Sequence, residues 1–151
     1  INHAVIKITL FFCIGAIIMM TGKKSIDDIK GLGREMPITM ICFTISAFAL
    51  MGTPPTNGFV SKWFLAIGGL DANRMIFPII LLISALLTAA YLLPISIFAF
   101  FSGDRQKEVV RKEPPMTMMI PIVVLTGISI LTGLFPNFLI EFVNDIIDTV
   151  L

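Results

Sequence analysis

The sequence predicts an all-α integral membrane protein with four transmembrane helices, of which the second is discontinuous. Three observations lead to this fold class. The 151 residues are 56% hydrophobic and only 14% charged, with a mean hydropathy of +0.96, whereas about a quarter of a typical soluble domain is charged. Two strongly basic connections separate the long apolar runs, and glycines and prolines interrupt one of these runs.

The first span is expected at residues 1–21. His3 and Lys7 stand four residues apart there and share one face of a helix. By the rise per residue, Lys7 lies about 10 Å into the apolar stretch, which makes it a candidate functional residue, whereas His3 is equally well explained as a solvated terminal histidine. The chain begins with Ile1 inside an apolar pattern, without an initiator Met or a basic leader, and we interpret it as a fragment of a longer polypeptide.

The second span, residues 36–68, carries Lys62 as its single charge. An unbroken helix of this length would measure roughly 50 Å, against about 30 Å of hydrocarbon core. Prolines remove backbone donors and glycines let the chain bend, so we predict two half-helices in one crossing. Four residues are expected to form the break: Gly52, Pro54, Pro55 and Gly58.

The alternative is a loop between two short apolar segments, with Lys62 reaching back to the membrane surface. Each half is too short to cross alone, and the apolar pattern continues after Lys62. Carbonyls freed by a break must be buried in protein or line a hydrated cavity. An ionisable residue inside a span is by default a candidate for function.

The third span is expected at about 75–101 and the fourth at about 116–135. Ser84, Thr88 and Tyr91 form a polar stripe on the third, which either faces a water path or bonds to neighbouring helices and its own backbone. After the fourth span, the tail has the spacing of an amphipathic helix. Its polar face is acidic, which favours a protein partner over anionic lipid.

The distribution of cations predicts the topology. Eight of the eleven Lys and Arg residues lie in the connections 22–35 and 102–115, four in each. Both connections should therefore be cytoplasmic, two crossings apart, with the C-terminus outside. If Pro54-Pro55 were a loop between two full crossings, three crossings would separate the basic connections and place them on opposite faces, so the charges support a single broken crossing.

All ten acidic residues lie outside the spans, so Lys7 and Lys62 have no carboxylate partner within them. Burial disfavours a charged lysine and a nearby anion favours it, which is the chemistry of a proton relay. We find no nucleophile and base, phosphate loop or metal-ligand spacing, and Cys13 and Cys42 stand alone in apolar runs. We therefore expect no catalytic site, redox centre, metal or cofactor in this chain, and the net charge of +1 gives no ground for nucleic-acid binding.

An ordered set of motifs resembles the C-terminal part of the antiporter-like subunits of respiratory complex I (NADH-quinone oxidoreductase), Mrp-type sodium/proton antiporters and related membrane hydrogenases. The resemblance runs from Ile1 to about Phe101. The motifs in chain order are Asn2-His3-Ala4-Val5-Ile6-Lys7, Leu10-Phe11-Phe12 with Gly15, Gly31-Leu32-Gly33 with Met36-Pro37, Gly52-Thr53-Pro54-Pro55, Gly58-Phe59 and Ser61-Lys62.

The resemblance implies the last four helices of a subunit with about fourteen, built from inverted repeats that each contain a broken helix. It aligns Lys62 with the lysine of the second broken helix, and His3 and Lys7 with the histidine and lysine that lead to it, as a proton path. It divides the chain into residues 1–101, the end of the antiporter domain, and residues 102–151, which hold the second connection, the last span and the tail.

The partners implied are other membrane subunits, the N-terminal helices of the same subunit and the lipid bilayer, in a cell inner membrane. The sequence does not decide between proton and sodium, nor between the Mrp antiporter, complex I and the hydrogenases, although Pro54-Pro55 with Lys62-Trp63 favours the D-type branch of the antiporter subunits. It also leaves open whether the whole assembly is an enzyme.

Two other readings remain. A self-sufficient homodimeric four-helix transporter would need an acid or an aromatic cage inside a span. A structural membrane anchor would tolerate Lys62→Ala.

Overall fold

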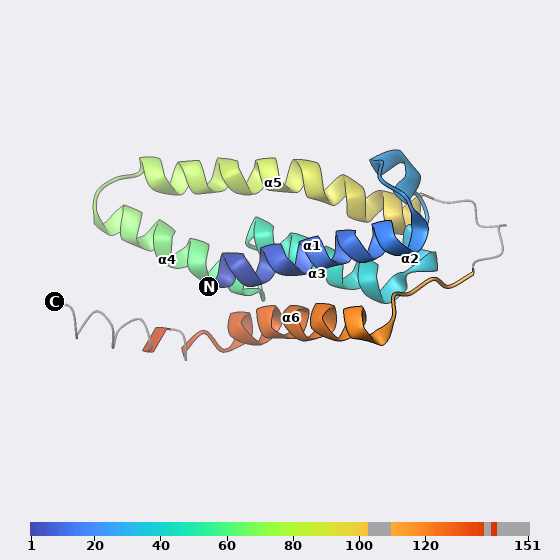
Figure 1. The fold of residues 1–151 in the computed structure, drawn as a ribbon. Coiled ribbons are helices and arrows are strands. Elements are labelled where there is room, and N and C mark those ends of the chain that lie inside the picture. Colours follow the sequence, from blue (N-terminus) through green and yellow to red (C-terminus); the bar gives the residue numbers. More distant parts are fainter. Residues whose placement is uncertain (103–109, 138–139, 142–151) are drawn as a thin grey trace.

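The computed structural model describes residues 1–102, 110–137 and 140–141, and within these ranges all regular structure is helical (Figure 1). This confirms the all-α fold. The elements in chain order are α1 (Asn2–Thr21), the 3₁₀ helix η1 (Ile26–Ile29), α2 (Leu32–Glu35), α3 (Pro37–Met51), α4 (Asn57–Asp71), α5 (Ile76–Phe101) and α6 (Met116–Leu134).

Three of the described helices, α1, α5 and α6, are long and apolar enough to cross a membrane. The fourth apolar segment, α3, has 15 residues and would measure roughly 22 Å at the rise of an α-helix. It therefore falls short of the hydrocarbon core, which needs about 20 residues. The three long helices begin and end within two residues of the bounds expected from the apolar runs.

Residues 52–56 separate α3 from α4. Gly52 ends α3 in the left-handed region, with φ of 87°, a conformation that glycine adopts without steric cost. The peptide bond between Pro54 and Pro55 is cis. After this turn α4 continues toward the same end of the molecule as α3 does (Figure 1).

The core lies where α1, α3 and α6 meet, and α5 covers α3 and α4 from the other side (Figure 1). α3 and α6 start at the same end of the molecule, whereas α1 and α5 run toward it. At that end the two connections touch, because Lys112 N donates a hydrogen bond to Glu35 O at 2.8 Å. The core residues with no exposed surface are Cys13, Ala16, Leu32, Met36, Met40, Ala49 and Ala99.

The first connection is more ordered than a polar linker. It contains η1 and α2, and Leu32 and Gly33 are buried. A Cβ on Gly33 would lie 2.6 Å from the Phe100 ring and 2.9 Å from the Ala99 carbonyl oxygen, so only glycine permits this contact with the end of α5. The amphipathic helix expected in the tail lies outside the described residues, apart from residues 140–141.

Candidate functional site

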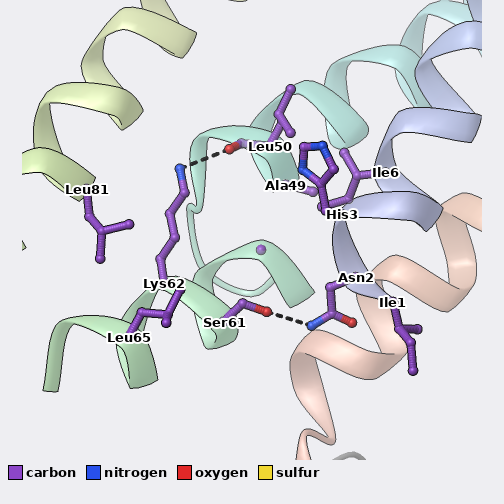
Figure 2. Close-up of a pocket in the computed structure, with 11 residues that line it drawn as sticks. Ile1, Asn2, His3, Ile6, Ala49, Leu50, Ser61, Lys62, Leu65 and Leu81 are labelled. Atoms are coloured by element: carbon purple, nitrogen blue, oxygen red, sulfur yellow. Dashed lines mark hydrogen bonds between the residues drawn. The ribbon is translucent and has the colours of Figure 1, made fainter. Parts of the chain in front are cut away.

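Lys62 on α4 reaches back to the end of α3. Its Nζ donates a hydrogen bond to Leu50 O at 3.0 Å (Figure 2) and a second one to Met51 O at 2.7 Å. The last four carbonyls of a helix lack intrahelical donors. The turn itself supplies donors to Phe48 O and Ala49 O, and Lys62 supplies them to the other two. A cation at a helix C-terminus also complements its partial negative charge.

Two glycines make this approach possible. A Cβ on Gly52 would lie 2.6 Å from Lys62 Cδ, so a side chain there would displace the lysine stem. A Cβ on Gly58 would overlap the carbonyl oxygen of Ala49 and lie 2.8 Å from its carbon. The first turn of α4 is therefore seated directly on the last turn of α3.

A cavity of about 480 Å³ opens beside Lys62, which is room for several water molecules. Its polar lining consists of Asn2 and His3 from α1 and Ser61 and Lys62 from α4, among apolar side chains that include Leu81 of α5. Figure 2 shows His3 and Lys62 approaching the end of α3 from two different helices. The structure thus brings these two predicted residues to one cavity.

Asn2 and Ser61 are site residues that the sequence did not single out. Asn2 Nδ2 donates a hydrogen bond to Ser61 Oγ at 2.8 Å and lies 3.4 Å from Asn57 O, which joins the start of α1 to α4 (Figure 2). The sequence feature that could have indicated them is their position, because Asn2 directly precedes His3 and Ser61 directly precedes Lys62.

Lys7 does not line this cavity, although it shares a helix face with His3. It is half-buried one turn further along α1. On α5, Thr88 is buried and donates a hydrogen bond to Ser84 O of its own helix at 2.7 Å, whereas Tyr91 is exposed. The polar stripe of α5 therefore does not form one continuous lining.

Cys13 and Cys42 are free and buried. Among the residues described, no group of three or more His, Cys, Asp or Glu side chains is placed to hold a metal ion. The chemistry of the site rests on a lysine, a histidine, an amide, a hydroxyl and two helix-end carbonyls. Such a set can bind water and pass protons.

Residues 1–88 match the model of the family described as NADH:quinone oxidoreductase/Mrp antiporter, transmembrane. NADH-quinone oxidoreductase subunit N of Desulforudis audaxviator (strain MP104C) is 35% identical over 89% of this chain and 29% of its own length. The D-type subunit of the Na⁺/H⁺ antiporter of Bacillus subtilis (strain 168) is 30% identical over 100% of this chain and 31% of its own length. The A-type subunit of the antiporter in the same organism is 33% identical over 92% of this chain and 19% of its own length.

The fold is also similar to a chain in the solved structure of the Mrp complex from Dietzia sp. DQ12-45-1b. The TM-score is 0.81 at 23% identity, over 93% of this chain and 34% of that one. This chain thus spans less than a third of the length of these sequence relatives.

Proposed function

Because the chain belongs to the NADH:quinone oxidoreductase/Mrp antiporter transmembrane family, we propose that it is the part of an ion-translocating membrane subunit in which Lys62 relays protons. The observation that carries the proposal is the position of the Lys62 ammonium, which bonds to the carbonyl end of α3 beside a cavity that also contains His3. The chain is a multi-pass integral membrane protein.

The relay works by exchange between two states of Lys62. In the protonated state, the two carbonyls and the negative end of α3 stabilise the ammonium. When Nζ gives a proton to water in the cavity, that water gives one of its protons to His3, and the neutral amine loses much of its attraction to the carbonyls. Lys7 then receives the proton one turn further along α1. Each step moves one proton between neighbouring groups and leaves the polypeptide otherwise unchanged.

α3 and α4 together form one discontinuous crossing in this proposal, which gives the chain four crossings. Two observations support it. α3 alone is shorter than the hydrocarbon core, and the described parts of the two basic connections meet at one end of the molecule. Both connections, 22–35 and 102–115, then face the cytoplasm at the inner membrane, with the C-terminus outside. Residues 1–101 form the C-terminal part of the antiporter domain in this proposal, and residues 102–151 hold the cytoplasmic connection, the last crossing and the tail.

The partners in the proposal are other membrane subunits and the helices that precede this segment in the full-length relatives. Those relatives are named as subunits of an NADH-quinone oxidoreductase and of Na⁺/H⁺ antiporters. The outward face of α1 is apolar and exposed, as expected for a surface that contacts a neighbouring helix or lipid. Its large exposed side chains are Ile8, Phe11, Phe12, Ile14, Ile18 and Met19.

The test is ion transport by membrane vesicles that contain the assembled complex with Lys62→Arg or Lys62→Ala. Arginine keeps a cation at the end of α3 but does not release its proton. We therefore expect Lys62→Arg to assemble and to lose transport, and Lys62→Ala to lose transport with weaker assembly. The matched control is Lys24→Ala, which removes an exposed cation from a connection. Transport at the wild-type rate by Lys62→Arg would refute the relay and favour a structural anchor.

A further inference from the structure

One face of α6 carries polar and small residues against the rest of the bundle. Ile122, Thr126 and Ser129 are buried, and with Gly133 they recur at the spacing of one helix face. A Cβ on Gly133 would lie 2.6 Å from Asn57 N, so this face presses directly on the backbone of the break. Ser129 Oγ donates a hydrogen bond to Asn57 Oδ1 at 2.8 Å.

α3 has a matching polar face. Thr39, Cys42 and Ser46 are buried at positions i, i+3 and i+7. α3 packs directly against α6, and Thr126, whose hydroxyl donates to Ile122 O of its own helix at 2.8 Å, is buried like Cys42. Because α3 and α6 start at the same end, the polar groups of both helices follow one another in the same direction, from the connections toward the break (Figure 1).

This file of groups begins at a carboxylate. Glu113, in the connection before α6, accepts hydrogen bonds from Ile38 N at 2.6 Å and from Thr39 Oγ1 at 2.7 Å. It ends at Asn57, whose side-chain Oδ1 accepts from Ser129 and whose backbone carbonyl oxygen accepts at 3.4 Å from Asn2 Nδ2 and from Ser61 Oγ, two side chains that line the Lys62 cavity. From Thr39 to Ser46 the helix rises roughly 10 Å, which Cys42 divides into two shorter steps.

Two atoms along the file have no hydrogen-bond partner among the described residues. They are Ser46 Oγ and Asn57 Nδ2, and each belongs to a side chain that is 1% exposed. An unpaired buried polar atom is costly, and in native proteins such atoms bond to internal water. Ser46 lies one turn after Cys42 on α3, and Asn57 lies at the break, where its Oδ1 accepts from Ser129.

We propose that the interface of α3 and α6 holds a file of water molecules that leads protons from Glu113 to Asn57 and on to the Lys62 cavity. Water at Ser46 and at Asn57 completes the file. A proton enters from the aqueous phase at Glu113 and moves by exchange of hydrogen bonds along hydroxyls and water, so no group gains or loses an electron. The inference rests on the proposed function, because Lys62 is the receiving group.

The competing explanation is packing alone, since small polar residues are common between transmembrane helices. The two explanations differ at Ser46. If its hydroxyl only fills space, Ser46→Ala removes an unpaired buried group, and stability and transport stay unchanged or improve. If the hydroxyl holds a water of the file, stability stays unchanged and transport slows. We expect a loss of about tenfold or more, which corresponds to about 1.4 kcal/mol of added barrier.

The experiment compares Ser46→Ala, Ser129→Ala and Lys62→Arg in vesicles with the assembled complex, by transport rate and by thermal unfolding. The matched control is Ser96→Ala, because Ser96 is buried against Thr44 at 3.1 Å, on the side of α3 toward α5. We expect slow transport in the Ser46 and Ser129 variants and a wild-type rate in the control.

The outcomes separate the two proposals. Wild-type transport by both serine variants, with transport abolished in Lys62→Arg, would overturn the water file and leave the relay in place. Wild-type transport by Lys62→Arg would overturn both. Slowing by Ser96→Ala equal to that by Ser46→Ala would assign the effect to general packing and would also overturn the file. If Ser46→Ala failed to assemble, the transport rate of Ser129→Ala would test the file from the α6 side.

Discussion

The contact between α3 and α4 predicts opposite effects for the same substitution at two glycines of one helix. In Gly58→Ala, the new Cβ overlaps the Ala49 carbonyl oxygen and lies 2.8 Å from its carbon. Backbone cannot turn aside as a side chain does, so α4 must move away from α3 until that carbon reaches ordinary contact at 3.4 Å or more. Overpacking of this kind costs about 1–3 kcal/mol.

Gly68→Ala is the matched control, because a Cβ there meets nothing within 4 Å. In a helix, alanine is more favourable than glycine by up to about 1 kcal/mol, so this variant should be neutral to slightly more stable. The midpoint of thermal unfolding in detergent is the assay. A change of 1 kcal/mol shifts it by roughly 2–4 °C for a domain of about 150–250 residues. We expect it to fall for Gly58→Ala and to stay or rise for Gly68→Ala.

The displacement has a second consequence that the same variants report. When α4 moves, Lys62 moves with it and away from the Leu50 and Met51 carbonyls that it now reaches at 3.0 and 2.7 Å. Transport by assembled Gly58→Ala should therefore fall, whereas Gly68→Ala should transport normally. Equal stability and equal transport in the two variants would refute the close seating of α4 on α3.

Further predictions follow from other contacts. Glu113→Ala should lower stability by about 0.5–2 kcal/mol in thermal unfolding, because it removes the carboxylate that accepts from Ile38 N and Thr39 Oγ1 at the start of α3. Glu113→Gln keeps an acceptor and should recover part of the loss, and equal stability of both variants with wild type would contradict the cap. Gly133→Ala should reduce the yield of assembled complex, whereas Gly127→Ala, with open space around its Cβ, should not. Cys13 and Cys42, which are 0% and 6% exposed, should react with a hydrophilic maleimide only after denaturation, as mass spectrometry can verify; rapid labelling of the native protein would contradict their burial.

The sequence predicted the helices well where the signal is local. The run 75–101 became α5, Ile76–Phe101, and the run 116–135 became α6, Met116–Leu134. Hydrophobic length, together with the prolines and glycines at the ends, decides such bounds without knowledge of the rest of the fold. The charges of the connection 22–35 predict a polar linker and give no sign of Leu32, which is fully buried.

Helical geometry explains why the sequence indicated only some of the residues that line the cavity. Spacing of four residues shows that His3 and Lys7 share a face, but it does not show at which depth along that face a cavity lies. The cavity lies at the level of the break, beside the first turn of α1, and so it takes in His3 and not Lys7. Asn57 and Ser129, 72 residues apart, meet only through the packing of α6 on the break, which no local pattern reveals.

The two ends of α3 acquire their partners at very different times during synthesis. The carbonyls at its C-terminus bond to Lys62, 11 and 12 residues later in the chain. The donors at its N-terminus bond to Glu113, which the ribosome adds 74 and 75 residues after them. Until that residue emerges, Ile38 N and Thr39 Oγ1 lack this acceptor, although α1 and α2, against which α3 packs, are already synthesised. We therefore expect the first turn of α3 to gain its final hydrogen bonds only after the connection before α6 has been made.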